Sequence, residues 1–182
     1  RYIPNNHVWR PCDAVESAIA WKAAIERAKA PSCLVFSRQN LAHQHRTDEQ
    51  VAAISRGGYV LADPGSATFD AILIATGSEV DLAVQAMRTL ADEGIAARVV
   101  SMPCPNVFDA QPVEYRESVL PGWCRKRVAV EAGVADYWRK YVGLDGAVVG
   151  IDTFGASAPA EALFRHFGFT VEHVVAAVRS LR

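Results

Sequence analysis

The stretch AILIATGSEVDLAVQAMRTLADEG, residues 71–94, decides the fold. Its first five residues, 71–75, form a short continuous apolar run, which is typical of a buried strand. The polar turn 76–79 follows directly, and apolar side chains then recur at helical spacing, at Val80, Val84, Met87 and Ala91. Gly94 is placed to end this helix, because glycine readily adopts the left-handed conformation of a C′ residue. A buried strand that leads straight into an amphipathic helix is a unit of parallel α/β sheets.

The same alternation of strand and helix continues on both sides of this stretch. Further strands are expected at 59–61, 98–101, 127–131 and 147–151. Further helices are expected around 110–119, 135–142, 159–168 and 170–181. This alternation predicts an α/β fold with a mostly parallel, doubly wound sheet from about residue 59 to the end of the chain.

Residues 1–55 contain too few elements to form a sheet core of their own. One clear helix begins after Asp13, which can cap it together with Glu16 three residues on, and a second helix is plausible over 48–55. One clear strand, Ser32–Phe36, is expected to be buried. The sequence therefore predicts an incomplete α/β segment, residues 1–55, in front of a complete small domain, residues 56–182. Because the chain begins abruptly at an arginine, we expect it to be part of a longer protein.

The composition excludes several classes of protein. The 182 residues include 19 basic and 20 acidic side chains, so the net charge of −1 provides no positive field for nucleic acid or an anionic membrane. No apolar run approaches the about 20 residues that a membrane-spanning helix needs, and we expect no signal peptide at the start of this sequence. The four cysteines have neither CxxC nor zinc-finger spacing, which favours reduced thiols in the cytoplasm.

Arg38 is the first candidate for a binding residue. It follows closely after the expected strand 32–36, and open α/β sheets bind ligands beyond the carboxyl ends of their strands. A guanidinium group donates two parallel hydrogen bonds to a phosphate or a carboxylate. An ordinary surface arginine or an ion-paired arginine is the alternative, and position alone favours that alternative.

Two further strand ends carry polar residues. The turn Thr76-Gly77-Ser78-Glu79 could hold a phosphate at the N-terminus of the following helix, but Glu79 and Asp81 already place negative charge there. We therefore favour plain capping of that helix. Glu131, at the end of the strand 127–131, has the position of a general base, although a helix cap or an ion pair is favoured.

The histidines and tryptophans carry weaker signals. His43 and His45 form a His-x-His pair with no nearby cysteine or carboxylate to complete a metal site, so a solvated pair is favoured. His43 is close enough to Arg38 in sequence to line the same cleft. The three residues interpreted as packing residues are Trp21, Trp123 and Trp138.

Several strings of the chain resemble transketolase. They are WRPCDAVESA at 9–18, FSRQNLAHQ at 36–44, RGGYVL at 56–61, ATGSEVDLA at 75–83, VVSMP at 99–103, YRESVLP at 115–121, VAVEAG at 128–133 and DYWRKYVGLDGAVVGIDTFGASAPAEALFRHFGFT at 136–170. Together they cover essentially the whole chain in the order of the family. The chain is therefore similar to the C-terminal part of a bacterial-type transketolase.

The resemblance implies an organisation and a function. Residues 1–55 would be the C-terminal end of the pyrimidine-binding domain, and residues 56–182 the transketolase C-terminal domain. Enzymes of the family transfer a two-carbon ketol unit between phosphorylated sugars, such as xylulose 5-phosphate and ribose 5-phosphate, in the pentose phosphate pathway. They use thiamine diphosphate with Mg²⁺ or Ca²⁺ and act as cytoplasmic homodimers. In the family, the arginine of the SRQNL string, here Arg38, binds the phosphate of the substrate.

The resemblance also implies what this chain lacks. The Gly-Asp-Gly…Asn segment that holds the metal and the diphosphate, and the glutamate that activates the aminopyrimidine, match no part of this sequence. We therefore assign no residue to catalysis, to the cofactor or to a metal, and expect the fragment to be inactive alone.

Two alternatives stay open. The chain could be a binding or assembly subunit of a split transketolase-like enzyme, paired with a separate N-terminal polypeptide. It could also belong to a related thiamine enzyme, such as a deoxyxylulose-phosphate synthase or a dehydrogenase β chain. The strings SRQNL and FGxSAPA favour transketolase over these related enzymes.

Overall fold

The computed structural model describes residues 1–66 and 68–181. Within them, the main sheet has the spatial strand order β3-β5-β4-β6-β7. Its strands are β3 (Tyr59–Ala62), β4 (Ala71–Ala75), β5 (Ala97–Ser101), β6 (Arg127–Val130) and β7 (Ala147–Val149). β4 runs parallel to β5 and β6, β7 runs parallel to β6, and β3 pairs antiparallel with β5 at one edge. The mostly parallel sheet predicted from residues 71–94 is confirmed.

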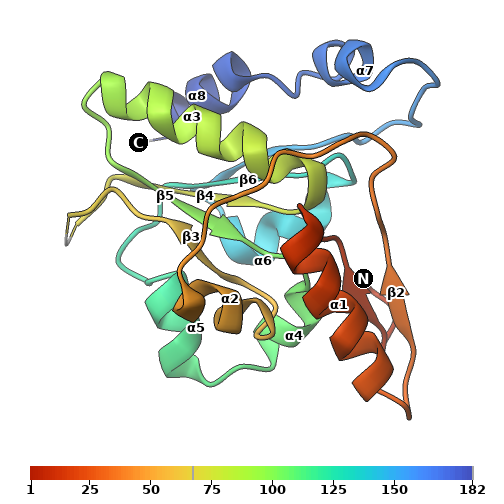
Figure 1. Ribbon diagram of the computed structural model, residues 1–182. Helices are drawn as coiled ribbons and strands as arrows, with labels where there is room; N and C mark the ends of the chain where they lie inside the picture. The colour runs from red at the N-terminus through yellow and green to blue at the C-terminus, as the bar shows by residue number, and fades with distance from the viewer. Residues whose placement is uncertain (67, 182) are drawn as a thin grey trace.

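Helices cover both faces of the sheet, which makes it doubly wound (Figure 1). On one face lie α3 (Val80–Asp92) and α8 (Val171–Ser180), and on the other lie α4 (Pro105–Asp109), α5 (Val113–Val119) and α6 (Arg139–Val142). α7 (Ala160–His166) lies at the periphery and contains no buried residue. None of the described helices is both long and apolar enough to cross a membrane.

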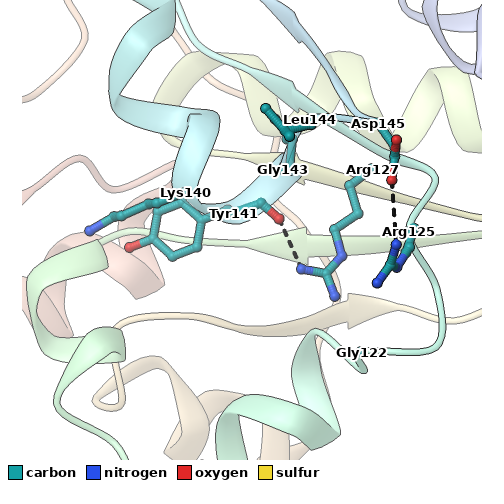
Figure 2. A pocket seen from close by; sticks show the side chains of 9 residues that line it. Gly122, Arg125, Arg127, Lys140, Tyr141, Gly143, Leu144 and Asp145 are labelled. Carbon is teal, nitrogen blue, oxygen red and sulfur yellow. Dashed lines mark hydrogen bonds and ion pairs between the residues drawn. The ribbon is translucent and has the colours of Figure 1, made fainter.

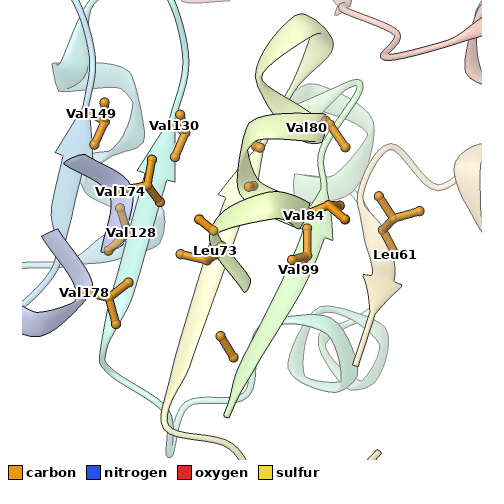
Figure 3. Close-up of a cluster of buried hydrophobic side chains, with 14 of the residues drawn as sticks. Leu61, Leu73, Val80, Val84, Val99, Val128, Val130, Val149, Val174 and Val178 are labelled. Carbon is orange, nitrogen blue, oxygen red and sulfur yellow. The ribbon is translucent and has the colours of Figure 1, made fainter. Parts of the chain in front are cut away.

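Alternate residues of the central strand β4 face two separate cores. Leu73 packs in the core that contains Val84 of α3 and Val174 of α8 (Figure 3). Its neighbours Ile72 and Ile74 lie in the opposite core, beneath α4, α5 and α6. All five side chains of β4 are buried, because a strand covered on both faces needs a continuous apolar run.

A separate two-stranded sheet precedes the main sheet in the chain. β1 (His7–Trp9) pairs in parallel with β2 (Ser32–Leu34), and α1 (Ala14–Glu26) connects these two strands. α2 (Asp48–Ile54) then leads into the main sheet. The sequence did not predict β1, because the strand begins with His7 directly after the polar residues Asn5 and Asn6 and so shows no continuous apolar run.

β2 corrects a second expectation, since it is shorter than 32–36 and is not buried. Cys33, Val35 and Phe36 are exposed. The physical reason is that β2 pairs only with β1 in the part of the chain that the structure describes.

Of the three tryptophans predicted to be packing residues, one is buried and two are exposed. Trp138 is fully buried, as a packing residue should be. Trp21 and Trp123 are 54% and 59% exposed, and each contacts one aromatic ring at the surface. The ring centroids of Trp21 and Phe36 lie 6.1 Å apart, and those of Trp123 and Phe69 lie 4.6 Å apart. The interpretation as packing residues therefore holds for the interior only at Trp138.

Candidate functional site

Arg38 lies in the β2–α2 loop, residues 35–47. β2 ends at Leu34, so Arg38 lies farther beyond the strand than the expected strand 32–36 would place it. The side chain is exposed, and no other described residue hydrogen bonds to its guanidinium or pairs with it. All five of its N–H donors are thus available to an anion from outside this chain.

The β2–α2 loop crosses in front of the main sheet and is held near both of its ends (Figure 1, orange). At the first end, the N–H of Val35 donates to the carbonyl of Trp9 at 2.8 Å. At the second end, the N–H of Gln44 donates to Oδ2 of Asp13 at 3.1 Å. The side-chain amide of Gln44 also donates to Oδ1 of Asp81, in the first turn of α3, at 3.1 Å. The loop is therefore attached to Trp9 and Asp13, which lie earlier in the chain, and to Asp81 of α3, a helix that packs on the main sheet.

A buried ion pair between Arg46 and Asp13 supports this second end. Nη1 of Arg46 lies 2.6 Å from Oδ2 of Asp13 and donates to the carbonyl of Gln44 at 2.8 Å. Nε of Arg46 donates to the hydroxyl of Tyr59 at 2.7 Å. Burial opposes ionisation of Asp13, but the hydrogen bonds from Arg46 and from the N–H groups of Glu16 and Gln44 lower its pKa. Asp13 is therefore held ionised.

A second carboxylate, that of Glu16, extends the network to the main sheet. Oε1 accepts from the hydroxyls of Tyr59 and Ser101 at 2.8 Å and 2.6 Å, and Oε2 accepts from the N–H of Cys12 at 2.7 Å. Burial, together with the nearby Glu16 carboxylate, raises the pKa of Tyr59 and keeps its phenol protonated. The predicted cap is confirmed, since Oδ1 of Asp13 accepts from the N–H of Glu16 at 3.0 Å. The network joins α1, the β2–α2 loop, β3 and β5.

The carboxyl ends of β4 and β6 form the second polar feature. β5 lies on one side of β4 and β6 on the other, so a topological switch point lies between β4 and β6, where open α/β sheets bind ligands. Two carboxylates, Glu79 after β4 and Glu131 after β6, are buried there, and we call this place the acidic crevice. Nη1 of Arg10 lies 2.6 Å from Oε1 of Glu131 and 3.0 Å from Oε2 of Glu79. The chain's own guanidinium thus occupies the crevice.

Further hydrogen-bond donors pair with the two carboxylates of the acidic crevice. Oε2 of Glu131 accepts from Nε1 of Trp138 at 2.6 Å and also pairs with Arg1, and Oε2 of Glu79 accepts from the N–H of Ala132 at 3.1 Å. Burial opposes ionisation of Glu131, but Arg1 and Arg10 lower its pKa. Glu131 is therefore an ion-paired residue, as the favoured interpretation expected.

The turn Thr76–Glu79 corrects an expectation. Residues Gly77–Glu79 form a single 3-10 turn, and Thr76 makes no side-chain cap. Instead, the N–H of Gly77 and the hydroxyl of Thr76 donate to the carbonyl of Arg10 at 3.0 Å and 3.2 Å. The predicted helix capping by this turn is wrong, since no side chain of the turn accepts from an N–H of the 3-10 turn or of α3, and the Thr76 side chain is turned toward the carbonyl of Arg10 instead.

The acidic crevice does not fit thiamine diphosphate. Two buried carboxylates would repel the diphosphate, and the Arg10 side chain fills the space. Across residues 1–66 and 68–181, no group of three or more His, Cys, Asp or Glu side chains could hold a metal ion.

His43 and His45 lie on the exposed side of the β2–α2 loop, with ring centroids 5.5 Å apart. Nδ1 of His43 is 3.6 Å from Oδ2 of Asp13. Both rings line a cavity of about 400 Å³ between the loop and α3. Arg38 does not line this cavity, so the shared cleft suggested by the sequence does not form there.

Another hollow, of about 360 Å³, is lined by three cationic residues, Arg125, Arg127 and Lys140 (Figure 2). All four hydrogen bonds of Arg127 go to backbone carbonyls, including that of Tyr141 at 2.8 Å. Lys140 lies 2.5 Å from Oδ2 of Asp109, and Arg125 lies 3.7 Å from the carboxylate of Asp145. Each of these cations thus already has a partner within the chain.

The sequence predicted a binding role for Arg38 but no role for Arg10, Arg46 or Tyr59. Arg46 stands in a polar stretch with no local signal. Arg10 carries a weak signal, because it lies between Trp9 and Pro11, which are both buried. A charged residue inside a buried stretch requires a partner elsewhere in the fold.

The fold and these contacts define a doubly wound α/β domain with the end of a second α/β unit attached to it. Comparison with known proteins shows which family has this combination. Residues 57–170 match the family model of the transketolase-like TK C-terminal domain, and residues 1–44 match that of the transketolase pyrimidine-binding domain. The chain belongs to the transketolase family, and it corresponds to the end of the pyrimidine-binding domain plus the C-terminal domain.

Individual relatives agree with this assignment. Transketolase 1 of Escherichia coli K12 is 61% identical over 181 residues, and Transketolase 2 of Pasteurella multocida is 60% identical over 183 residues. Each match covers 100% of this chain but 27% of the relative, so the chain spans about a quarter of their length.

Solved structures show the same relationship. Transketolase from Leishmania mexicana superposes with a TM-score of 0.89 at 43% identity, covering 98% of this chain and 25% of that one. Transketolase from Pichia stipitis in complex with sedoheptulose 7-phosphate gives 0.89 at 40% identity, covering 99% and 26%.

Proposed function

We propose that the chain is the C-terminal portion of a cytoplasmic, homodimeric transketolase. The complete enzyme would transfer a two-carbon ketol unit from a phosphorylated ketose to a phosphorylated aldose. Thiamine diphosphate with Mg²⁺ would supply the carbanion chemistry, bound by segments other than this one. Residues 1–55 would end the pyrimidine-binding domain, and residues 56–182 would form the C-terminal domain.

Arg38 carries this proposal. Its exposed guanidinium stands without a partner among the described residues, on a loop that is attached at both ends. A guanidinium fork suits the phosphate of a sugar phosphate and would fix the distance between that phosphate and the reacting carbon. Relatives in the same family have been solved with sedoheptulose 7-phosphate and with xylulose 5-phosphate.

The exposed apolar side of residues 1–55 supports the proposal that this unit is completed by further chain. Trp21, Ile25 and Phe36 are 54%, 72% and 45% exposed, on α1 and beside β2. Apolar surface of this kind marks an interaction face. In a complete transketolase, the rest of the pyrimidine-binding domain would cover it, and we expect the isolated chain to be inactive.

A hybrid enzyme tests this proposal. In the hybrid, residues 1–182 replace the matching quarter of E. coli Transketolase 1. We expect ketol transfer from xylulose 5-phosphate to ribose 5-phosphate within about tenfold of the parent enzyme, and no transfer by the 182-residue chain alone.

Two outcomes would change the conclusion. A hybrid that dimerises and binds thiamine diphosphate, yet transfers no ketol unit, would contradict the proposal. If the separate 182-residue chain restored activity to the remaining three quarters of E. coli Transketolase 1, the chain would act as a split subunit instead.

A further inference from the structure

The contacts of Gln44 show how the main sheet reaches the loop that carries Arg38. Gln44 is 8% exposed, and its amide donates to Oδ1 of Asp81 on α3 at 3.1 Å. Its backbone N–H donates to Oδ2 of Asp13 at 3.1 Å. One residue of the loop is thus fixed by both structural units of the chain.

The loop has few other restraints. Between Val35 and Gln44, the described structure contains no backbone–backbone hydrogen bond made by the loop. Residues 38–40 are exposed. On the C-terminal side of Arg38, Gln44 is the nearest residue that hydrogen bonds to a residue outside the loop.

We propose that Gln44 is a positioning residue for Arg38, and that the C-terminal domain, through Asp81, holds the phosphate-binding loop in place. This inference rests on the proposed function of Arg38. It gives the C-terminal domain a direct part in substrate selection, since α3 belongs to that domain and lies outside the pyrimidine-binding unit.

A positioning role differs from a purely structural role in its substrate dependence. A guanidinium displaced by a fraction of an ångström hydrogen bonds less well to a phosphate. A sugar that carries no phosphate does not make this contact, so its reaction should not be affected. A structural defect would instead lower the activity on both sugars by the same factor.

The test uses the hybrid enzyme with ribose 5-phosphate and ribose as acceptors. Gln44→Met keeps the length of the side chain but removes the donor to Asp81. We expect kcat/KM for ribose 5-phosphate to fall by about three- to tenfold, mostly through KM, and kcat/KM for ribose to stay within about twofold.

Matched variants separate the contact from its surroundings. Asp81→Asn keeps the oxygen that accepts from Gln44 and should retain the phosphate preference, whereas Asp81→Leu should lose it as Gln44→Met does. Gln85→Met removes the other partner of Asp81, which lies 2.6 Å from Oδ2, and should leave the preference unchanged.

A double-mutant cycle makes the result decisive. With Arg38 already replaced by Gln, adding Gln44→Met should produce no further change in the preference for the phosphorylated acceptor. An equal fall for both acceptors, or a full additional effect in the Arg38→Gln background, would overturn the positioning role while leaving the phosphate contact standing. If Arg38→Gln itself did not alter the preference, both proposals would fall.

Discussion

Arg10 and Glu131 meet at the carboxyl end of β6, with Nη1 of Arg10 2.6 Å from Oε1 of Glu131. The two residues belong to the two structural units of the chain. Arg10 follows β1, and Glu131 follows a buried strand of the main sheet. The crevice in which a sheet of this class binds ligands is therefore used to attach the preceding unit.

Replacing Arg10 by Met should destabilise the chain strongly. The substitution leaves the carboxylates of Glu79 and Glu131 buried without their shared guanidinium, which should cost about 3–5 kcal/mol. The free energy of unfolding in urea measures this loss. Arg88→Met is the control, since Arg88 is exposed, and should change the value by less than about 0.5 kcal/mol. A loss at Arg10 no larger than at Arg88 would show that the pair contributes nothing.

Acid should weaken the fold through Glu131. Its pKa is lowered in the folded chain despite burial, because Arg1 and Arg10 lie beside it. A carboxylate with a depressed folded pKa contributes stability above its ordinary pKa of 4.5 and loses it as the pH falls through the lower folded value. We therefore expect stability to decline below about pH 4.5. In Glu131→Gln the chain should be less stable at pH 7, and its decline in acid should be smaller.

Unfolding curves between about pH 3 and pH 7 measure this dependence. Glu114→Gln is the control, because Glu114 is exposed and has no hydrogen-bond or ion-pair partner in the described residues. If the stability of Glu131→Gln fell in acid as much as that of the unchanged chain, Glu131 would not be the cause of the acid sensitivity.

Gly57 should not tolerate a side chain. Its φ is +84°, and a Cβ there would lie 2.3 Å from the carbonyl oxygen of Cys104 and 2.7 Å from the nitrogen of Phe108. Gly57→Ala should therefore cost about 2–4 kcal/mol, from backbone strain plus a clash with backbone atoms that cannot move away. Gly94→Ala is matched in φ, at +78°, but meets no atom within 4 Å, and should cost only about 1–2 kcal/mol. Equal losses in urea unfolding would contradict the close approach at Gly57.

Cys33 should be the thiol that reacts in the folded chain. It is exposed on β2, whereas Cys12, Cys104 and Cys124 are buried. Burial raises the pKa of Cys104 to about 11, which leaves little thiolate at neutral pH. Titration with a thiol reagent should label one cysteine before unfolding, and Cys33→Ser should abolish this fast reaction. In the hybrid enzyme, slower labelling of Cys33 would show that the rest of the enzyme covers the exposed apolar side of residues 1–55.

Local patterns in the sequence predicted most of the sheet and few of the contacts that join its parts. Residues 71–75 and the apolar positions of α3 could be predicted because burial on both faces and helical spacing leave a visible period. β1 could not, since His7 and the polar residues before it leave no continuous apolar run there. The Arg46–Asp13 and Arg10–Glu131 pairs join residues 33 and 121 positions apart, and no local period encodes such pairs.

Arg38 was predicted from a family string more than from its position. Its distance from the end of β2 weakened the argument from strand ends, because the loop beyond Leu34 continues for several residues before Arg38. The attachments of that loop at Gln44 and Arg46 are tertiary contacts, and they became visible only in the structure.

Substitution of Arg38 by Gln in the hybrid enzyme tests the central claim most directly. The measurement is kcat/KM for ribose 5-phosphate and for ribose, with xylulose 5-phosphate as the ketol donor. If Arg38 binds the phosphate of the acceptor, kcat/KM for ribose 5-phosphate should fall about ten- to a hundredfold, and kcat/KM for ribose should stay within about twofold. An equal loss for both acceptors would contradict the phosphate contact.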